Sequence, residues 1–232
     1  MGASLEPRDQ EPSMTHGDDA PTTFRPIAFV YFDLGKVLLD FSHERSCERM
    51  AALTGLSASR VRGVVYNTPL EHAYERGDIT SREFHERFCE ATGTRPGYEA
   101  LREACADMFS VIHETHGIVA RLHDRGHRLG ILSNTCEAHW ARCVADYPLL
   151  TERFLIHALS YELRSTKPEP DIYRAAAAMA GAAPREIFFT DDRADNVAGA
   201  LEAGFDAVRF ESPSGLEREL RARGLLDAGD SR

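Results

Sequence analysis

The feature that most constrains the fold is the apolar run that precedes Asp33. Residues 27–32 read IAFVYF, an unbroken apolar stretch rich in β-branched and aromatic side chains. Such a run is typical of a strand buried on both faces of a parallel sheet. Asp33 would then stand at the carboxyl end of this strand, where open α/β sheets bind ligands. Gly35 breaks the strand pattern and allows a tight turn or a close approach of the backbone.

The C-terminal half of the chain predicts more strands of this kind. After residue 117, short apolar segments alternate with helical patterns. The predicted strands are 128–132, 154–160, 186–190 and 206–210, and the predicted helices are 118–127, 137–147, 167–181, 194–205 and 214–224. This alternation predicts an α/β fold, a Rossmann-like, doubly wound parallel sheet with helices on both faces.

Residues 43–113 show helical periodicity without strand-like alternation. Thr80 is a candidate helix N-cap, and Glu83 stands at the capping-box position of the same helix. We therefore expect an all-helical insert at 43–113, lying over the sheet edge, within a core domain formed by 26–42 and 114–232. Residues 1–25 are polar and contain three prolines, which predicts a disordered tail.

Composition excludes several classes of function. A net charge of −10 argues against a broad nucleic-acid surface, since phosphate backbones attract basic proteins. No apolar run is long enough to span a bilayer, so no membrane partner is expected. The five cysteines are odd in number and form no CxxC pair, which indicates reduced thiols and a cytoplasmic location.

Four segments are predicted to meet at the sheet edge, and each carries polar side chains that can bind a ligand or take part in a reaction. They are FDLGKVLLD with Asp33, LSNT with Ser133 and Asn134, KPEPDIY with Lys167, and FFTDDRADN with Asp191 and Asp192. In this order and at this spacing, the segments resemble the motifs of the haloacid dehalogenase (HAD) superfamily. Within it, they look most like the α-D-glucose-1-phosphate phosphatase-like branch, which has a helical cap.

The resemblance implies a phosphatase reaction through a covalent intermediate. Asp33 would be the nucleophile and form an aspartyl-phosphate, a role for which a carboxylate is competent. Lys167 would neutralise charge on the phosphate and on the intermediate. Ser133 and Asn134 would bind phosphate oxygens, although Ser-Asn-Thr is also an ordinary N-cap sequence.

The resemblance also implies a Mg²⁺ cofactor. Asp33, the backbone carbonyl of Gly35 and Asp192 would hold the ion, with Asp191 as a further candidate. Hard oxygen ligands of this kind suit Mg²⁺. Asn196 would lie behind the ligands, and either aspartate of the pair could instead cap the following helix.

The chain departs from the HAD pattern directly after the nucleophile. Most HAD phosphatases carry a second aspartate, the general acid and base, at the position of Gly35. Its loss removes a contribution of ~10²–10⁴ in rate. Asp40 and His43 are candidates to activate water, and Lys36 could meet the phosphate or face solvent. Esters of more acidic alcohols should then react best, so hexose-1-phosphates are favoured over hexose-6-phosphates.

Three functions remain open at this point. The leading one is a Mg²⁺-dependent phosphatase acting on a small phosphorylated metabolite, such as a sugar phosphate, as a monomer or homodimer. The second is a 2-haloacid dehalogenase, in which Asp33 would attack carbon. The third is a non-catalytic HAD-fold protein that binds a phosphorylated ligand or a partner. In the insert, Tyr74, Glu75 and Arg76 could reach a substrate and set its selectivity.

Overall fold

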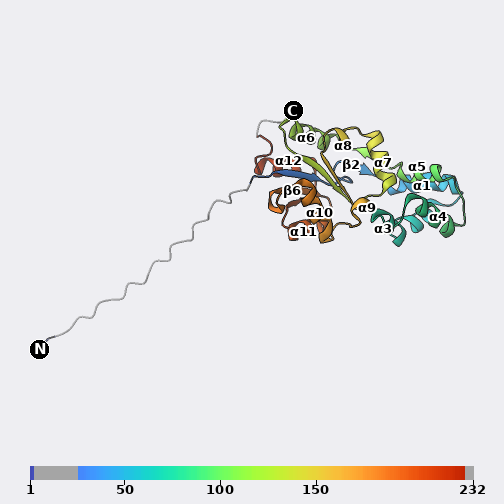
Figure 1. Cartoon of the computed structure of the whole chain (residues 1–232), viewed down its shortest axis with the longest axis horizontal. Helices are drawn as coiled ribbons and strands as arrows, with labels where there is room; N and C mark the ends of the chain where they lie inside the picture. Colours follow the sequence, from blue (N-terminus) through green and yellow to red (C-terminus); the bar gives the residue numbers. More distant parts are fainter. Residues whose placement is uncertain (3–25, 228–232) are drawn as a thin grey trace.

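The computed structural model describes residues 1–2 and 26–227. Almost all of the tail predicted to be disordered, 1–25, lies outside these residues. Figure 1 shows a core built around a sheet and, beside it at one end, a lobe made of helices. Within the described part of the chain, no helix is long and apolar enough to cross a membrane.

The core contains a parallel sheet with the strand order β5-β4-β1-β6-β7. Its strands are β1 (Phe29–Phe32), β4 (Leu129–Ser133), β5 (Ile156–Leu159), β6 (Ile187–Asp191) and β7 (Asp206–Arg209). The central strand β1 has β4 on one side and β6 on the other, and all of its residues are buried. The predicted α/β fold with a doubly wound parallel sheet is confirmed.

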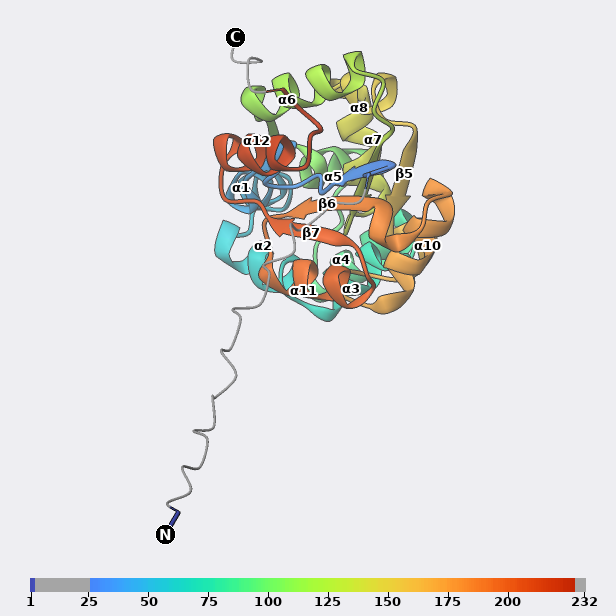
Figure 2. The same cartoon turned by 90° about the vertical axis from the view of Figure 1, so that its left-hand side faces the viewer.

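Helices cover both faces of this sheet (Figures 1 and 2). One apolar cluster packs α6 (His113–Asp124), α7 (Glu137–Asp146), α8 (Leu149–Glu152) and α12 (Pro213–Ala222) against one face. A second cluster packs α10 (Pro170–Ala180) and α11 (Ala194–Glu202) against the other. The short helices α9 (Ser160–Leu163) and η1 (Pro184–Glu186) complete the connections.

The helical lobe, residues 43–106, lies between the first and second sheet strands in the sequence. It consists of α1 (His43–Thr54), α2 (Ala58–Val65), α3 (Pro69–Glu75), α4 (Ser81–Thr92) and α5 (Tyr98–Ala106). It has an apolar core of its own, centred on side chains such as Met50, Phe88 and Leu101. Thr80 caps α4 and forms the predicted capping box with Glu83.

A short antiparallel ribbon joins the lobe to the core. Strand β2 (Leu39–Phe41) pairs with β3 (Phe109–Val111). The stretch 43–113, predicted to contain no strand, therefore includes one near its C-terminal end, and α6 already begins at His113. Three residues are too few to show the period-2 pattern that identifies a strand in a sequence.

Candidate active site

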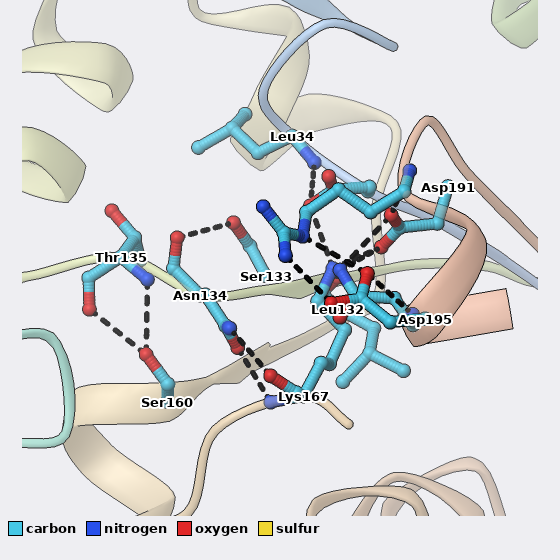
Figure 3. Close-up of polar contacts among 12 residues, drawn as sticks. Leu34, Leu132, Ser133, Asn134, Thr135, Ser160, Lys167, Asp191 and Asp195 are labelled. Atoms are coloured by element: carbon cyan, nitrogen blue, oxygen red, sulfur yellow. Dashed lines mark hydrogen bonds and ion pairs between the residues drawn. The ribbon is translucent and has the colours of Figure 1, made fainter. Parts of the chain in front are cut away.

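The sheet topology brings three of the predicted segments to one edge. Asp33 follows β1, Ser133 ends β4 and Asp191 ends β6. Because the three strands are parallel neighbours, these residues all lie at their carboxyl ends. Figure 3 shows Ser133 and Asp191 among the side chains at this edge.

Lys167 reaches the same point from the loop that precedes α10. Its ammonium Nζ lies 2.8 Å from Asp33 Oδ1, 2.5 Å from Asp191 Oδ2 and 2.8 Å from the carbonyl oxygen of Leu132. The side chain is only 1% exposed, so its three donors are used by three buried acceptors. The lysine therefore links β1, β4 and β6 at the site (Figure 3).

Burial and the charge of the ion-pair partner shift the pKa values of Lys167 and Asp33 in opposite directions. Burial favours the neutral form of Lys167, but the charges and hydrogen bonds of Asp191 and Asp33 outweigh it and raise the pKa of this lysine. Burial raises the pKa of Asp33 well above its usual range, against the opposing effect of Lys167 and with the help of Asp191. A carboxylate in this position depends on nearby positive charge to stay ionised.

Asn134 holds the backbone of Lys167 in place. Its amide nitrogen donates to the carbonyl oxygen of Lys167 at 3.0 Å, and its Oδ1 accepts from the Lys167 N–H at 2.7 Å. One amide N–H of Asn134 remains for a ligand, and the residue lines the cavity described below. Ser133 is buried and donates to the carbonyl oxygen of Asn134 at 3.3 Å. It is not among the residues that line this cavity.

Three carboxylates form a compact oxygen cluster. Oxygen atoms of Asp33, Asp191 and Asp192 lie within 4.8 Å of one another. Asp191 is fully buried and accepts from the Arg193 N–H at 2.9 Å and from Asn196 Nδ2 at 3.0 Å. Asp192 is half-buried, and burial together with Asp191 raises its pKa. Asp191 thus holds the start of α11 through Arg193 and Asn196 and also belongs to the cluster, but it is not the N-cap of that helix.

The two residues that follow Leu34 contact Phe41 and its neighbour Asp40. A Cβ atom on Gly35 would lie 2.8 Å from Phe41 Cε1, so a larger residue would displace this ring. Lys36 adopts a left-handed backbone with φ of 60°. Its ammonium group bonds to Asp40 and, at 3.0 Å, to the carbonyl oxygen of Phe41. The ammonium group of Lys36 is therefore bound to residues of β2, although the residue also borders the cavity.

A cavity of about 420 Å³ lies between this edge and the helical lobe. Its walls from the core include Asp33, Lys167 and Asp192, and its walls from the lobe are His43, Asn67, Glu71 and Glu75. Asn67 and Glu71 are not among the site residues predicted from the sequence. Glu71 and Glu75 are four residues apart on α3, and this spacing could have indicated a common face.

Of the three lobe residues proposed to reach a substrate, only Glu75 borders this cavity. Tyr74 is buried, with its hydroxyl 2.6 Å from Ser81 Oγ. Arg76 turns to the core and forms an ion pair with Glu169. Burial, with the nearby charges of Glu71 and Asp33, raises the pKa of Glu75 to about 8, while Lys167 and Arg193 lower it.

Comparison with known proteins agrees with this geometry. The chain is similar to D-ribitol-5-phosphate phosphatase of Bacteroides thetaiotaomicron, with 23% identity over 84% of this chain and 97% of the relative. The crystal structure of the HAD family enzyme bt-2542 from the same organism, in complex with magnesium and inorganic phosphate, superposes with a TM-score of 0.72. It is 26% identical and covers 82% of this chain and 98% of its own.

A dehalogenase also shares the fold. L-2-haloacid dehalogenase from Xanthobacter autotrophicus matches with a TM-score of 0.60 and 23% identity, covering 84% of this chain and 83% of its own. The model of the haloacid dehalogenase-like hydrolases matches residues 30–204, which include Asp33, Lys167 and the Asp191-Asp192 pair. The chain therefore belongs to the haloacid dehalogenase-like hydrolase family.

Proposed function

We propose that the protein is a Mg²⁺-dependent phosphatase that hydrolyses a small phosphorylated metabolite through an aspartyl-phosphate. The observation that carries this proposal is the buried Lys167, held between Asp33 and Asp191 beside a third carboxylate, Asp192. A phosphoryl group needs a nucleophile and compensating positive charge at one point, and these residues supply both.

The residues at the site fit a magnesium ion. Three carboxylates stand against one buried ammonium group, which leaves excess negative charge in a poorly solvated place. Hard oxygens of this kind suit Mg²⁺. In addition, the buried Oδ1 of Asn196, beside Asp191, has no hydrogen-bond donor among the described residues. We propose that Asp33, Asp192 and the carbonyl of Gly35 hold the ion, with Asp191 as a further ligand.

Bound Mg²⁺ would reduce the repulsion between the carboxylates and an anionic phosphate. The carboxylate of Asp33 attacks phosphorus and displaces the alcohol. Lys167 stabilises the charge on the transferring group from its fixed position between β1 and β6. Asn134 keeps Lys167 in place through its two backbone contacts and can offer its remaining N–H to a phosphate oxygen. Ser133 orders the same loop and remains a proposed phosphate contact.

A sugar or polyol phosphate is the substrate class we propose. A cavity of about 420 Å³ is large enough for a small metabolite, and its wall from the lobe carries Asn67, Glu71 and Glu75. Amide and carboxyl side chains suit the hydroxyl groups of a sugar. The similarity to a phosphatase of D-ribitol-5-phosphate supports the same class. Hexose-1-phosphates belong in the first panel to be assayed.

The cluster of three carboxylates favours this proposal over the two alternatives. Displacement of halide from carbon by Asp33 needs no metal, so a cluster of three carboxylates has no role in a dehalogenase of this kind. A purely binding protein has no need of a nucleophile held beside a lysine. Both alternatives remain outcomes of the experiment below.

The test is hydrolysis of p-nitrophenyl phosphate and of 2-chloropropionate, each with Mg²⁺ and with EDTA. We expect phosphate release with Mg²⁺ only, and no chloride release. Asp33→Asn should abolish turnover and leave the circular dichroism spectrum unchanged. Chloride release without metal would identify a dehalogenase, and no reaction on a panel that includes sugar phosphates would favour a binding protein. Substantial activity in a clean Asp33→Asn preparation would remove Asp33 as nucleophile.

A further inference from the structure

The proposed reaction lacks a proton donor near the nucleophile. The ring of Phe41 fills the space next to Gly35, so no carboxyl can stand there without a rearrangement. Asp40 is bound by Lys36 and does not line the cavity. His43 does line it, but burial first, with help from positive neighbours, lowers its pKa and leaves the ring in its neutral form. Neither residue can protonate a leaving alcohol at neutral pH.

The turn formed by residues 74–77 at the end of α3 is attached to the core. The hydroxyl of Tyr74 accepts a hydrogen bond at 3.3 Å from the N–H of Ala138, the second residue of α7. Arg76 pairs with Glu169, two residues after Lys167. Gly77 packs so closely on the carbonyl of Tyr161 that a Cβ atom there would overlap with it. This docked turn therefore has a fixed position relative to the site.

The backbone of Glu75 is tied to the loop after β4. Ser160 Oγ lies 2.6 Å from the carbonyl oxygen of Glu75, to which it donates, and the same hydroxyl accepts from the Thr135 N–H at 2.9 Å. Thr135 follows Asn134 directly, and Asn134 holds Lys167. One hydroxyl group thus connects Glu75 to the loop that positions the lysine.

The carboxyl group of Glu75 is free to react. It borders the cavity that Asp33 also borders, and it makes no hydrogen bond or ion pair with any described residue. Glu71, by contrast, already accepts from the Asn67 N–H at 2.6 Å. The other titratable groups around this cavity are Lys36 and the neutral His43 near the start of the lobe, and Lys167, Asp192, Arg193 and Asp195 from the core. A carboxyl that faces several carboxylates across a poorly solvated space holds its proton at neutral pH.

We infer that Glu75 is the general acid and general base of the reaction, in place of the carboxyl that residue 35 lacks. This inference rests on the proposed phosphatase function. In the first step, a bond forms between phosphorus and Asp33, and the bond to the leaving oxygen breaks. That oxygen takes the proton of Glu75. In the second step, the Glu75 carboxylate takes a proton from the attacking water, the bond between phosphorus and Asp33 breaks, and phosphate leaves.

The test compares wild type with Glu75→Gln on phosphate esters whose leaving groups differ in acidity but carry no extra hydroxyls. Ethyl, trifluoroethyl and 2,4-dinitrophenyl phosphate form such a series, assayed with saturating Mg²⁺. For ethyl phosphate, kcat/KM should fall by ~10²–10⁴-fold, since an alkoxide leaves poorly without a proton. For 2,4-dinitrophenyl phosphate, kcat/KM should change by less than about threefold, because its leaving group needs no acid.

A second readout follows the breakdown of the intermediate. With 2,4-dinitrophenyl phosphate, Glu75→Gln should show a burst of dinitrophenolate followed by slow turnover, because water attack then lacks its base. Wild-type kcat/KM for ethyl phosphate should fall above about pH 8, and the value for the aryl ester should not. Glu71→Gln is the matched control. It alters a carboxyl on the same helix and cavity wall and should leave the dependence on the leaving group as in wild type.

The outcomes separate the two proposals. An equal loss on all three esters, or no loss on any, would overturn the role of Glu75 while the phosphatase function stands. The same holds if Glu71→Gln reproduces the change. If wild type hydrolyses none of the esters with Mg²⁺, the proposed function fails and the inference fails with it. Both glutamines are close in shape to the residues they replace, and matching thermal unfolding curves establish that the variants are folded.

Discussion

At the scale of single residues, the buried Lys167 and the partly buried Glu75 meet opposite electrostatic conditions. Lys167 keeps its charge because Asp33 and Asp191 lie within hydrogen-bond distance. Glu75 has no cation in contact among the described residues, so burial decides its state and raises its pKa to about 8. The same poorly solvated space thus contains a permanent charge and a carboxyl that retains its proton.

This difference predicts how stability depends on pH. An unfolded glutamate loses its proton near pH 4.5, whereas folded Glu75 keeps it until about pH 8. Between these values the folded state binds the extra proton, so Glu75 lowers the free energy of unfolding as pH rises. Glu75→Gln removes this dependence. We expect it to stabilise the protein relative to wild type by more than about 1 kcal/mol at pH 8, and much less at pH 5.

Urea unfolding at the two pH values, in EDTA to exclude bound metal, measures this difference. A stability difference between Glu75→Gln and wild type that stays constant from pH 5 to pH 8 would show that the folded glutamate titrates normally. The comparison uses no substrate, so it is independent of the kinetic test.

At the scale of elements, the docked turn of residues 74–77 is one of the attachments that join the helical lobe to the core. Its contacts reach α7, α9 and the loop before α10, each through a different residue. Elsewhere the lobe is joined to the core by the β2-β3 ribbon and by packing of α5 on α7. The turn places Glu75 in the wall of the cavity. Loss of its attachment to the core should therefore reduce activity more than it reduces the stability of the fold.

Gly77→Ala tests this attachment. Gly77 has a φ of +78°, and a Cβ atom there would overlap with the carbonyl of Tyr161. Gly93→Ala is the control, because Gly93 has a φ of +71° but no atom within 4 Å of its added Cβ. In both variants, an alanine in the left-handed backbone conformation should lower the free energy of unfolding by about 1 kcal/mol. In Gly77→Ala, the overlap with Tyr161 should lower it by a further ~1–3 kcal/mol, or the turn should detach from the core.

The measurements are urea unfolding and kcat/KM for ethyl phosphate. Gly77→Ala should reduce kcat/KM at least tenfold, roughly the effect of a misplaced catalytic group, and Gly93→Ala should leave it within about twofold. Equal effects of the two substitutions on activity would mean that docking of the turn does not place Glu75.

At the scale of the whole molecule, the sequence predicts the sheet well because β1, β4, β5 and β6 are short, largely apolar and followed by a polar residue. Asp33 and the Asp191-Asp192 pair could be placed at one edge because parallel strands end together, whereas the resemblance to the HAD motifs implied the place of Lys167. The ribbon strand β3 could not be predicted, since three residues carry no period.

The contacts between lobe and core were also beyond prediction. Nothing in the sequence pairs Arg76 with Glu169, or ties the carbonyl of Glu75 to Ser160. Such contacts depend on how two separately packed units meet, and only the structure shows that Tyr74 and Arg76 turn away while Glu75 enters the cavity. The expected preference for hexose-1-phosphates assumed that no general acid is present, and Glu75 is the candidate that would remove this preference.

The most direct test of the account is the identity of the covalent intermediate. The wild-type protein is quenched in acid while it hydrolyses 2,4-dinitrophenyl phosphate with Mg²⁺, and its peptides are then examined by mass spectrometry. The same experiment is done with Glu75→Gln, the variant in which the intermediate should accumulate. We predict one phosphoryl group on the peptide that contains Asp33, and conversion of Asp33 to homoserine by borohydride. A phosphoryl group on another residue, or steady hydrolysis without any phosphorylated peptide in either protein, would contradict the account.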